Sequence, residues 1–459
     1  MTSILWLRRD LRRRDLPALQ AAASAGPVLP LFVIDPQLWS SGGAARRAWL
    51  AATLLALRES YDGALCLRHG DPAVVLPELA GKVGSQLVQV SRETTPAGVA
   101  RDRRVRKALA NKGIEWAETG SPYAVGPGLV RNRAGDPYRV FTPFARSWRD
   151  HGWPRPAAEP AELRWARVES DEEAWRLVES AAAAAPTALP LAGEEAAWQR
   201  WRRFRDEDLA DYADLRDRPD LDRSSRLSPY LKLGVLHPRS LLAEAGAGPG
   251  ADRFVTELAW REFYADVLHH HPGSAWHDLR AELAGLAYAD LADPQVAQRV
   301  DAWRCGRTGY PLVDAGMRQL LTEGWMHNRV RMVTASFLTK DLHVWWPVGA
   351  RHFLDHLIDG DVASNGHGWQ WVAGTGTDAA PYFRIFNPVT QGQRMDPDGA
   401  YVRRYLPELA HLPGSAAHEP WLHPQGYAHG YPRRIIDHAE ERREALARLE
   451  AVRGRRAGA

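Results

Sequence analysis

The chain has 459 residues, of which 45% are hydrophobic and 25% are charged, and its formal net charge is only +3. This is the composition of an ordinary globular protein of two or three domains, and the weak positive charge fits a nucleic-acid binder without requiring one. Charges come too early for a secretory signal, and no apolar run reaches the roughly 20 residues of a membrane span, so we expect a cytoplasmic protein. The two cysteines lack metal or redox spacing and make a disulfide framework implausible.

Residues 1–125 form the first predicted domain, in which short apolar runs alternate with helical segments. The runs that we expect to be strands are Ile4–Leu7, Val28–Ile34, Ala64–Leu67, Gln86–Val90 and Ile114–Ala117. This alternation predicts a parallel sheet covered on both faces, a doubly wound α/β domain. Ligands of such sheets bind beyond the carboxyl ends of the strands, where Asp10, Asp35 and Glu93 follow, although ordinary capping explains each of them as well.

Residues 126–195 are rich in Pro, Ala and Gly, which predicts an extended interdomain connection with some short helices in it. Residues 196–435 show helical periodicity without a comparable strand pattern, so the second domain is predicted to be all-α. Residues 436–459 form a charged tail that we expect to be a solvated, partly frayed helix. Within the second domain, helices are expected at about 229–233, 238–245, 251–269, 309–323, 326–338 and 350–357.

The stretch Asp359–Trp371 combines more kinds of chemistry than any other. Asp359, Asp361 and Asn365 offer directional hydrogen bonds to a polar ring. Three glycines, at 360, 366 and 368, predict a loose backbone that approaches a flat ligand closely. Trp369 and Trp371 offer surfaces for stacking or for carrying an electron, although most of the nineteen tryptophans are expected to fill a helical core. The stretch therefore predicts a cofactor site.

Ser228-Pro229 has the residues of a helix N-cap followed by proline at the first helical position. Ser224, Ser225 and Arg226 precede it, and hydroxyls beside free backbone N–H groups at a helix start form a natural phosphate site. A plain helix cap is the alternative, and it explains Ser228-Pro229 equally well without the three preceding residues.

Two helical segments each place unusual side chains on one face. The first face has residues at i, i+3, i+4 and i+7, namely Glu257, Trp260, Arg261 and Tyr264. The second consists of Asn328, Arg331 and Met332. A purely structural helix would carry aliphatic residues there, so these faces predict a polar cavity that binds an anion or the edge of a base. An exposed Glu–Arg pair beside a core Trp, and a solvated helix, are the alternatives.

Five motifs occur in the order in which the photolyase/cryptochrome family has them, and they cover most of the chain. They begin at Ser224 (Ser-Ser-Arg-Leu-Ser-Pro-Tyr-Leu), Glu257 (Glu-Leu-Ala-Trp-Arg-Glu-Phe-Tyr), Thr308 (Thr-Gly-Tyr-Pro-Leu-Val-Asp-Ala-Gly-Met-Arg), Trp325 (Trp-Met-His-Asn-Arg-Val-Arg-Met) and Asp359. The chain most resembles a class I cyclobutane pyrimidine dimer photolyase of that family. The resemblance implies an α/β domain with an antenna chromophore and a helical domain that holds FAD in a folded conformation.

The resemblance also implies a role for each matching residue in FAD binding. Arg331 resembles the residue that pairs with Asp359 beside the flavin, and Asn365 resembles the residue that faces flavin N5. The other implied contacts of FAD are Tyr212, Ser224, Ser225, Arg226, Leu227, Ser228, Gly360 and Asp361. Gly366-His367 stands where the family usually has Asn-Gly, and we expect the difference to be tolerated.

Asn328 and Met332 stand where members that repair (6-4) lesions carry histidines, so the resemblance indicates a cyclobutane dimer in damaged DNA as the substrate. The enzymes of this family take the lesion out of the base stack. Glu257 would bond the lesion's thymine edge, and Trp260 and Trp371 would stack on its rings. The remaining implied DNA contacts are Arg261 and Gln391.

Trp369 and Trp346 match two of the family's electron-relay tryptophans, which makes them catalytic candidates together with Glu257 and Asn365. The third, outer tryptophan is missing before Trp303. Tyr288 or Trp303 are possible substitutes, so the outer end of the relay is open.

The antenna is expected to be 8-hydroxy-5-deazaflavin, with Arg9, Asp35 and Asp102 as contacts. The alternative is methenyltetrahydrofolate, but folate-binding members carry an acidic residue near Gly98–Arg101, and none precedes Asp102. We expect a monomer that needs no metal and no protein partner. A cryptochrome-type signalling flavoprotein is the alternative function, and Asn365 and the short tail favour repair. A generic nucleotide-binding module would leave the helical motifs unexplained.

Overall fold

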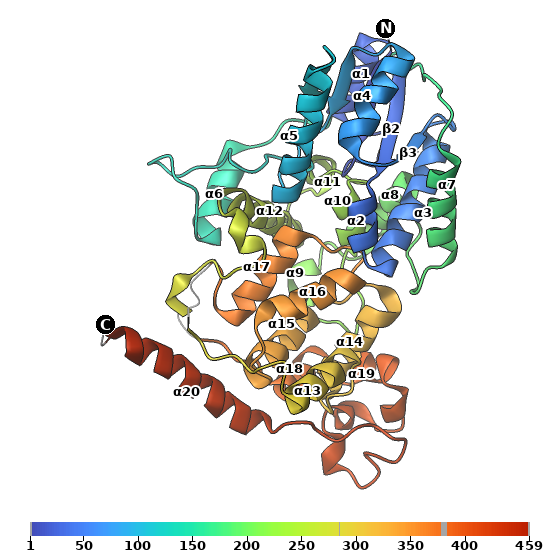
Figure 1. Ribbon diagram of the computed structural model, residues 1–459. Coiled ribbons are helices and arrows are strands. Elements are labelled where there is room, and N and C mark those ends of the chain that lie inside the picture. The colour runs from blue at the N-terminus through green and yellow to red at the C-terminus, as the bar shows by residue number, and fades with distance from the viewer. Residues whose placement is uncertain (1, 284, 378–382, 458–459) are drawn as a thin grey trace.

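The protein is described by a computed structural model of residues 2–283, 285–377 and 383–457 (Figure 1). Five parallel strands form one sheet in the order β3-β2-β1-β4-β5. They are β1 (Ser3–Leu7), β2 (Val28–Ile34), β3 (Cys66–His69), β4 (Leu87–Val90) and β5 (Glu115–Glu118). The predicted doubly wound α/β domain is confirmed, and each predicted strand lies within two residues of the observed one.

Helices cover both faces of this sheet, because successive strand residues point to opposite sides. Ile4 and Trp6 pack in one cluster with residues of α4 and α5. Leu5 and Leu7 pack in another cluster with residues of α1 and α3. The helices of this region are α1 (Pro17–Ala25), α2 (Pro36–Ser41), α3 (Ala44–Ser60), α4 (Pro72–Val83) and α5 (Pro96–Ala110).

The predicted connection contains two full helices, α6 (Phe141–His151) and α7 (Glu172–Ala183), and both are packed on the domains rather than free of them. Phe144 and Trp148 of α6 and Val178 of α7 are buried in the core. Trp165, which lies between the two helices in the sequence, forms an isolated parallel bridge with Val28 at the start of β2. The connection is therefore more regular than the composition of residues 126–195 predicts.

The rest of the described chain is helical. The longer helices are α8 (Glu194–Glu207), α12 (Pro249–His270), α13 (Pro294–Arg304), α14 (Pro311–Glu323), α15 (Asn328–Ser336), α16 (Trp346–His356), α17 (Val362–Ala373), α18 (Pro388–Met395) and α20 (His438–Ala457). The shorter ones are α9 (Tyr212–Leu215), α10 (Ser228–Leu233), α11 (Pro238–Glu244) and α19 (Ala400–Tyr405). Short turns of other helix types are η1 (Pro272–Ala275), η2 (Ala281–Leu283), η3 (Phe337–Asp341), η4 (Pro407–Leu409), η5 (Gly414–His418) and η6 (Pro420–Leu422).

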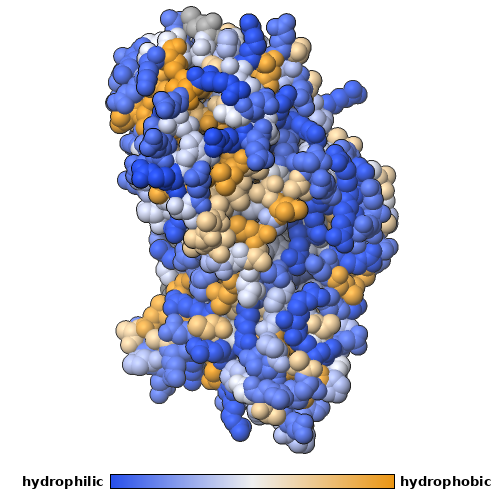
Figure 2. Space-filling view, turned by 90° about the vertical axis from the view of Figure 1, so that its right-hand side faces the viewer, coloured by the Kyte–Doolittle hydropathy of each residue, from blue (hydrophilic) through white to orange (hydrophobic). Residues whose placement is uncertain are grey.

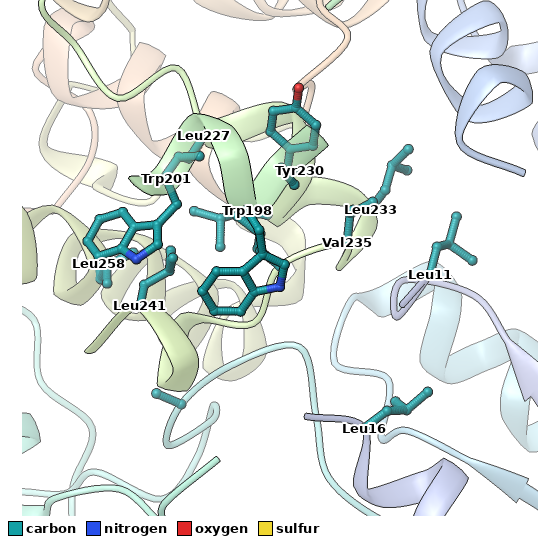
Figure 3. Close-up of a cluster of buried hydrophobic side chains, with 14 of the residues drawn as sticks. Leu11, Leu16, Trp198, Trp201, Leu227, Tyr230, Leu233, Val235, Leu241 and Leu258 are labelled. Atoms are coloured by element: carbon teal, nitrogen blue, oxygen red, sulfur yellow. The ribbon is translucent and has the colours of Figure 1, made fainter. Parts of the chain in front are cut away.

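One hydrophobic core runs from the sheet into the helical region. Leu11 and Leu16, which follow β1, belong to the same buried cluster as Trp198 and Trp201 of α8 (Figure 3). Leu258 of α12 lies in that cluster as well. The two predicted domains are consecutive in the sequence, but they share one hydrophobic core.

Three local predictions were wrong in part. The glycines of residues 359–371 do not loosen the backbone: α17 begins directly after Asp361, whose Oδ1 accepts the N–H of Ser364 at 3.0 Å and caps the helix. Ser228 is the first residue of α10 rather than its cap, because its hydroxyl donates to Asp359 instead. The tail is a helix that is solvated on one side only, because its other side buries Ala445, Leu449 and Val452.

No helix in the described ranges is long and apolar enough to cross a membrane. On the side that is on the right in Figure 1, hydrophilic residues predominate and the hydrophobic ones form small, separate groups (Figure 2).

Candidate active site

A cavity of about 560 Å³ lies among α10, α12, α15 and α17. It collects every residue that the sequence assigned to FAD and all but one of those assigned to the lesion. The lining includes Tyr212, Ser224, Ser225, Arg226, Leu227, Ser228, Glu257, Trp260, Arg261, Asn328, Arg331, Met332, Asp359, Gly360, Asp361, Asn365, Trp369 and Trp371. Residues that are far apart in the sequence therefore share one site.

Asp359 is the most buried acidic group of this cavity, with a side chain that is 3% exposed. Its Oδ2 accepts hydrogen bonds from the hydroxyl of Ser228 at 2.6 Å and from the guanidinium of Arg331 at 2.8 Å. Its Oδ1 is buried and has no partner among the described residues, and the same holds for the hydroxyl of Ser224. Buried polar atoms are normally paired, so these two atoms indicate that a polar ligand completes the site.

Asp361 joins the cavity to the sheet domain. Its Oδ2 lies 3.1 Å from Nη2 of Arg9 and 3.2 Å from Nζ of Lys232. Burial opposes ionisation of this carboxyl, but Lys232 and Arg9 together hold its pKa well below the usual range. Burial lowers the pKa of Lys232 to about 8, with Asp361 acting in the opposite direction. The carboxylate therefore binds the two parts of the molecule together as well as capping α17.

The amide of Asn365 has a fixed orientation, because its Nδ2 donates to the carbonyl oxygen of Ala350 at 3.0 Å. The Oδ1 atom is then the part of this amide that remains for a ligand. Trp369 follows one helical turn later and also lines the cavity, pressed against Gly349 of α16. Asn365 and Trp369 thus present a hydrogen-bond acceptor and an aromatic ring on one face of α17.

Glu257 is held by two arginines. Its Oε1 accepts a hydrogen bond from Nη1 of Arg216 and lies 3.2 Å from Nη2 of Arg253. Burial raises the pKa of Tyr212 to about 12, and the charge of Glu257 adds to the increase. Arg261 is engaged differently, since its guanidinium donates to the carbonyl oxygens of Pro122 and Leu231.

The face of α15 places Asn328, Arg331 and Met332 at the cavity as predicted. Arg329, between them, donates to Asp217 at 2.7 Å and contacts the sulfur of Met332 at 3.7 Å. On the other side of the cavity, the guanidinium of Arg384 lies 5.8 Å from the ring centre of Trp371.

Of the relay candidates, Trp346 begins α16 and Trp369 lies in α17, whereas Trp303 belongs to α13 and Tyr288 precedes it. Trp369 packs edge-on against Trp303, with ring centres 6.1 Å apart, and Trp303 is fully buried, so it is not a surface residue. Trp346 is fully buried too, and its Nε1 donates to Asp278 at 2.6 Å. Trp345 lies 6.5 Å from Trp346 and 6.4 Å from the half-buried Tyr288.

The structure places the other predicted residues outside the cavity lining. Gln391 is a half-buried residue of α18. Arg9 pairs with Asp361, and Asp102 is paired with Arg101 at 2.8 Å and also with Arg8. Asp35 accepts the N–H of Gln37 and caps α2.

His367, the unusual residue of the last motif, is buried beside the cavity rather than in its lining. Its Nε2 lies 3.0 Å from the hydroxyl of Ser274, its Nδ1 lies 2.8 Å from the carbonyl oxygen of Ala363, and its ring stacks on Tyr264. Burial lowers the pKa of this imidazole to about 4.

Several lining residues were not assigned to the site from the sequence, and among them are the basic or aromatic Arg216, Lys232, Arg253, Trp325 and Arg384. The i, i+4 spacing of Tyr212 and Arg216, and of Arg253 and Glu257, is a signal that could have found two of them. The others depend on contacts between distant segments.

The fold and the cavity define a protein that holds a large cofactor between helices, next to a parallel-sheet domain. A family model described as "DNA photolyase" matches residues 3–161, and one described as "FAD binding domain of DNA photolyase" matches residues 254–451. A deoxyribodipyrimidine photo-lyase of Halobacterium salinarum is 40% identical over 98% of this chain and 99% of that protein. The chain therefore belongs to the DNA photolyase family.

Two solved structures are similar over nearly the whole length. A bacterial class III photolyase from Agrobacterium tumefaciens has a TM-score of 0.89 and 35% identity, covering 99% of this chain and 98% of that one. A cryptochrome from Synechocystis has a TM-score of 0.86 and 28% identity, covering 97% of this chain and 98% of that one.

Proposed function

We propose that this protein is a deoxyribodipyrimidine photo-lyase that repairs cyclobutane pyrimidine dimers in DNA in a light-dependent reaction. The observation that carries the proposal is the shared cavity. The residues expected to hold FAD, such as Asp359 and Asn365, line it together with the face expected to meet the lesion, on which Glu257 and Trp260 lie.

The residues of the cavity fit FAD. The buried, unpartnered Oδ1 of Asp359 and hydroxyl of Ser224 can bond polar groups of the cofactor, and Arg226 and Arg331 supply positive charge. FAD bound there in its reduced form would supply the reversible, light-driven electron transfer by which the cyclobutane ring is split. Arg331 and Asp359 form a charge-assisted pair that fixes the position of the carboxylate before the cofactor arrives.

Asn365 and Glu257 offer hydrogen-bond acceptors to different ligands, Asn365 to the cofactor and Glu257 to the lesion. Because the Nδ2 of Asn365 donates to Ala350, its Oδ1 is available to accept a hydrogen bond from an N–H group of the cofactor ring. Glu257, which contacts both Arg216 and Arg253, can accept hydrogen bonds from the N–H groups of a thymine edge. Trp260 and Trp371 offer flat faces on which the extruded bases can stack and from which water is excluded. One chain supplies this whole lining, so we propose that the monomer is active.

The test is repair of an oligonucleotide with a single dimer under blue light, by protein with reduced FAD. Glu257→Ala should keep FAD but repair about 10- to 100-fold more slowly, because it loses charge-assisted hydrogen bonds to the lesion. Glu195→Ala, on the exposed side of α8, is the control and should repair normally. If wild-type protein leaves the dimer intact, the repair proposal is wrong and a cryptochrome-type role becomes the better explanation.

We also propose that electrons reach the flavin along Trp346, Trp345 and Tyr288. The ring centres of these residues are spaced by 6.5 and 6.4 Å, and Trp345 and Tyr288 are partly exposed whereas Trp346 is buried. Trp303 is buried and therefore cannot exchange electrons with a reductant in water. Tyr288→Phe should slow light-driven reduction of the flavin more than Trp303→Phe, and the opposite order would exclude this path.

For the second chromophore we propose a site at the carboxyl ends of the strands, where doubly wound sheets bind ligands. Arg9 and Asp102 lie there within ion pairs, and Asp35 follows β2 directly. The absence of an acidic residue before Asp102 in α5 favours a deazaflavin over a folate. Absorption spectra after reconstitution with 8-hydroxy-5-deazaflavin or methenyltetrahydrofolate, each added separately, distinguish the two.

A further inference from the structure

The ring of Phe141 lies flat against the indole of Trp260. Phe141 is the first residue of α6 and is 8% exposed, and the two ring centres are 3.6 Å apart with an angle of 7° between the planes. This separation is an ordinary carbon–carbon contact of about 3.5–4.0 Å, so the rings overlap with almost no lateral offset. Aromatic pairs prefer offset or edge-to-face arrangements, so the surrounding structure imposes this one.

Two sets of contacts impose it. Phe263 stands edge-on to both rings, 5.8 Å from Phe141 at 68° and 5.8 Å from Trp260 at 73°. One to two turns further along α6, Nε1 of Trp148 donates at 2.9 Å to Glu262, a buried carboxylate of α12. Figure 1 shows α6 lying beside α12. The plane of the Trp260 indole is therefore set by Phe263 of its own helix together with α6, which the bond from Trp148 holds against α12.

Only one face of this indole remains for a ligand. Trp260 is half-buried and lines the cavity, one turn after Glu257, whereas Phe141 is not among the described residues that line it. Tyr264 packs at the indole from within α12, with ring centres 5.3 Å apart at 42°. With Phe141 covering one face, a flat ring that enters the cavity meets the other face at a fixed angle.

We propose that Phe141 is a positioning residue that selects the stacked, extruded dimer by holding the plane of Trp260. The inference rests on the proposed function, because the ligand ring is a base of the dimer. It assigns to the connecting segment a part in lesion recognition that the cavity lining does not reveal. Phe141 contributes little to binding of undamaged duplex, whose bases remain stacked in the helix and do not reach the indole.

The experiment compares the Kd of a dimer-containing oligonucleotide with that of the same undamaged oligonucleotide, in the dark, for FAD-loaded protein. Phe141→Leu keeps the apolar volume but removes the flat face. We expect it to raise the Kd for the dimer by about five- to tenfold, with less than a twofold change for undamaged DNA. Phe141→Tyr should restore the wild-type Kd, because it restores the ring.

Phe144→Leu is the matched control, since Phe144 is a buried ring of the same helix that packs on Phe263 instead of Trp260. A Trp260→Leu background is the second control, because the effect of Phe141→Leu should disappear there. If Phe141→Leu is not recovered with FAD, the flexible Phe141→Met replaces it in the same series.

The proposal is overturned if Phe141→Leu binds the dimer as wild type does. It is also overturned if Phe144→Leu loses as much dimer affinity, or if the loss persists in the Trp260→Leu background. Failure of the proposed function has a different signature, namely wild-type protein that binds both oligonucleotides equally.

Discussion

Gly349 of α16 lies directly against the indole of Trp369 in α17, and replacing it with alanine tests the packing that holds this indole. A methyl carbon at this position would lie 2.6 Å from Cζ3 of Trp369 and from Cδ2 of Leu338, and closer still to Cη2 of the indole. Ordinary contacts lie at about 3.5–4.0 Å, so the indole must move by roughly 1 Å or more. Such overpacking costs about 1–3 kcal/mol, against a gain of about 1 kcal/mol for alanine over glycine within a helix.

The control for Gly349→Ala is Gly81→Ala in α4, where the added carbon would meet no atom within 4 Å. It should stabilise the protein by up to about 1 kcal/mol. The difference between the two variants in the free energy of unfolding, about 1–3 kcal/mol, then measures the overpacking itself. Because Trp369 lines the cavity, Gly349→Ala should also bind less FAD, measured from the ratio of flavin to protein absorbance. A Gly349→Ala protein that gains as much stability as Gly81→Ala with full flavin content would refute the reasoning.

Three further outcomes are expected. Asp359→Asn should release FAD about tenfold more readily in dialysis, because Arg331 loses its charge-assisted partner, and unchanged retention would contradict the assigned pair. Asp361→Asn should lower the free energy of unfolding by about 3 kcal/mol, since it leaves buried Arg9 and Lys232 without their shared carboxylate, whereas wild-type melting would show that the cluster is not stabilising. His367 has a folded pKa of about 4, below the roughly 6.5 of an unfolded imidazole, so its stabilisation is complete above pH 6.5 and is lost as the pH falls towards 4. His367→Asn should therefore lose up to about 3 kcal/mol less stability than wild type over that interval, and parallel pH profiles would exclude this role.

The elements that could be predicted are those whose signal is local. The strands were found because buried parallel strands are continuous apolar runs, and α12 and α15 were found because their unusual side chains recur at helical spacing. The helix α17 was missed because Gly366 and Gly368 lower helix propensity, while the cap that starts the helix depends on how Asp361 is placed in space.

The part of the site that could not be predicted from the sequence consists of contacts between distant segments. The residues on the face of α12 that carries Glu257 and Trp260 could be named from the sequence, but the residues that contact them could not. Nothing in the spacing of Phe141 indicates that it would lie on Trp260. Similarly, Ser228 reads as a cap, and only the fold brings Asp359 close enough to take its hydroxyl hydrogen bond.

The ion pairs of Asp361 with Arg9 and Lys232 have a consequence for how this protein can be divided. The sheet domain ends in the sequence long before α17 begins, yet it supplies one of the two cations on the cap of that helix, and the hydrophobic core is continuous across the same boundary. A fragment without the first domain would leave Asp361 short of a partner and expose the apolar side of α8. Exchange of the first domain between relatives would meet the same obstacle, because the incoming domain would have to supply both a cation for Asp361 and an apolar surface that fits α8.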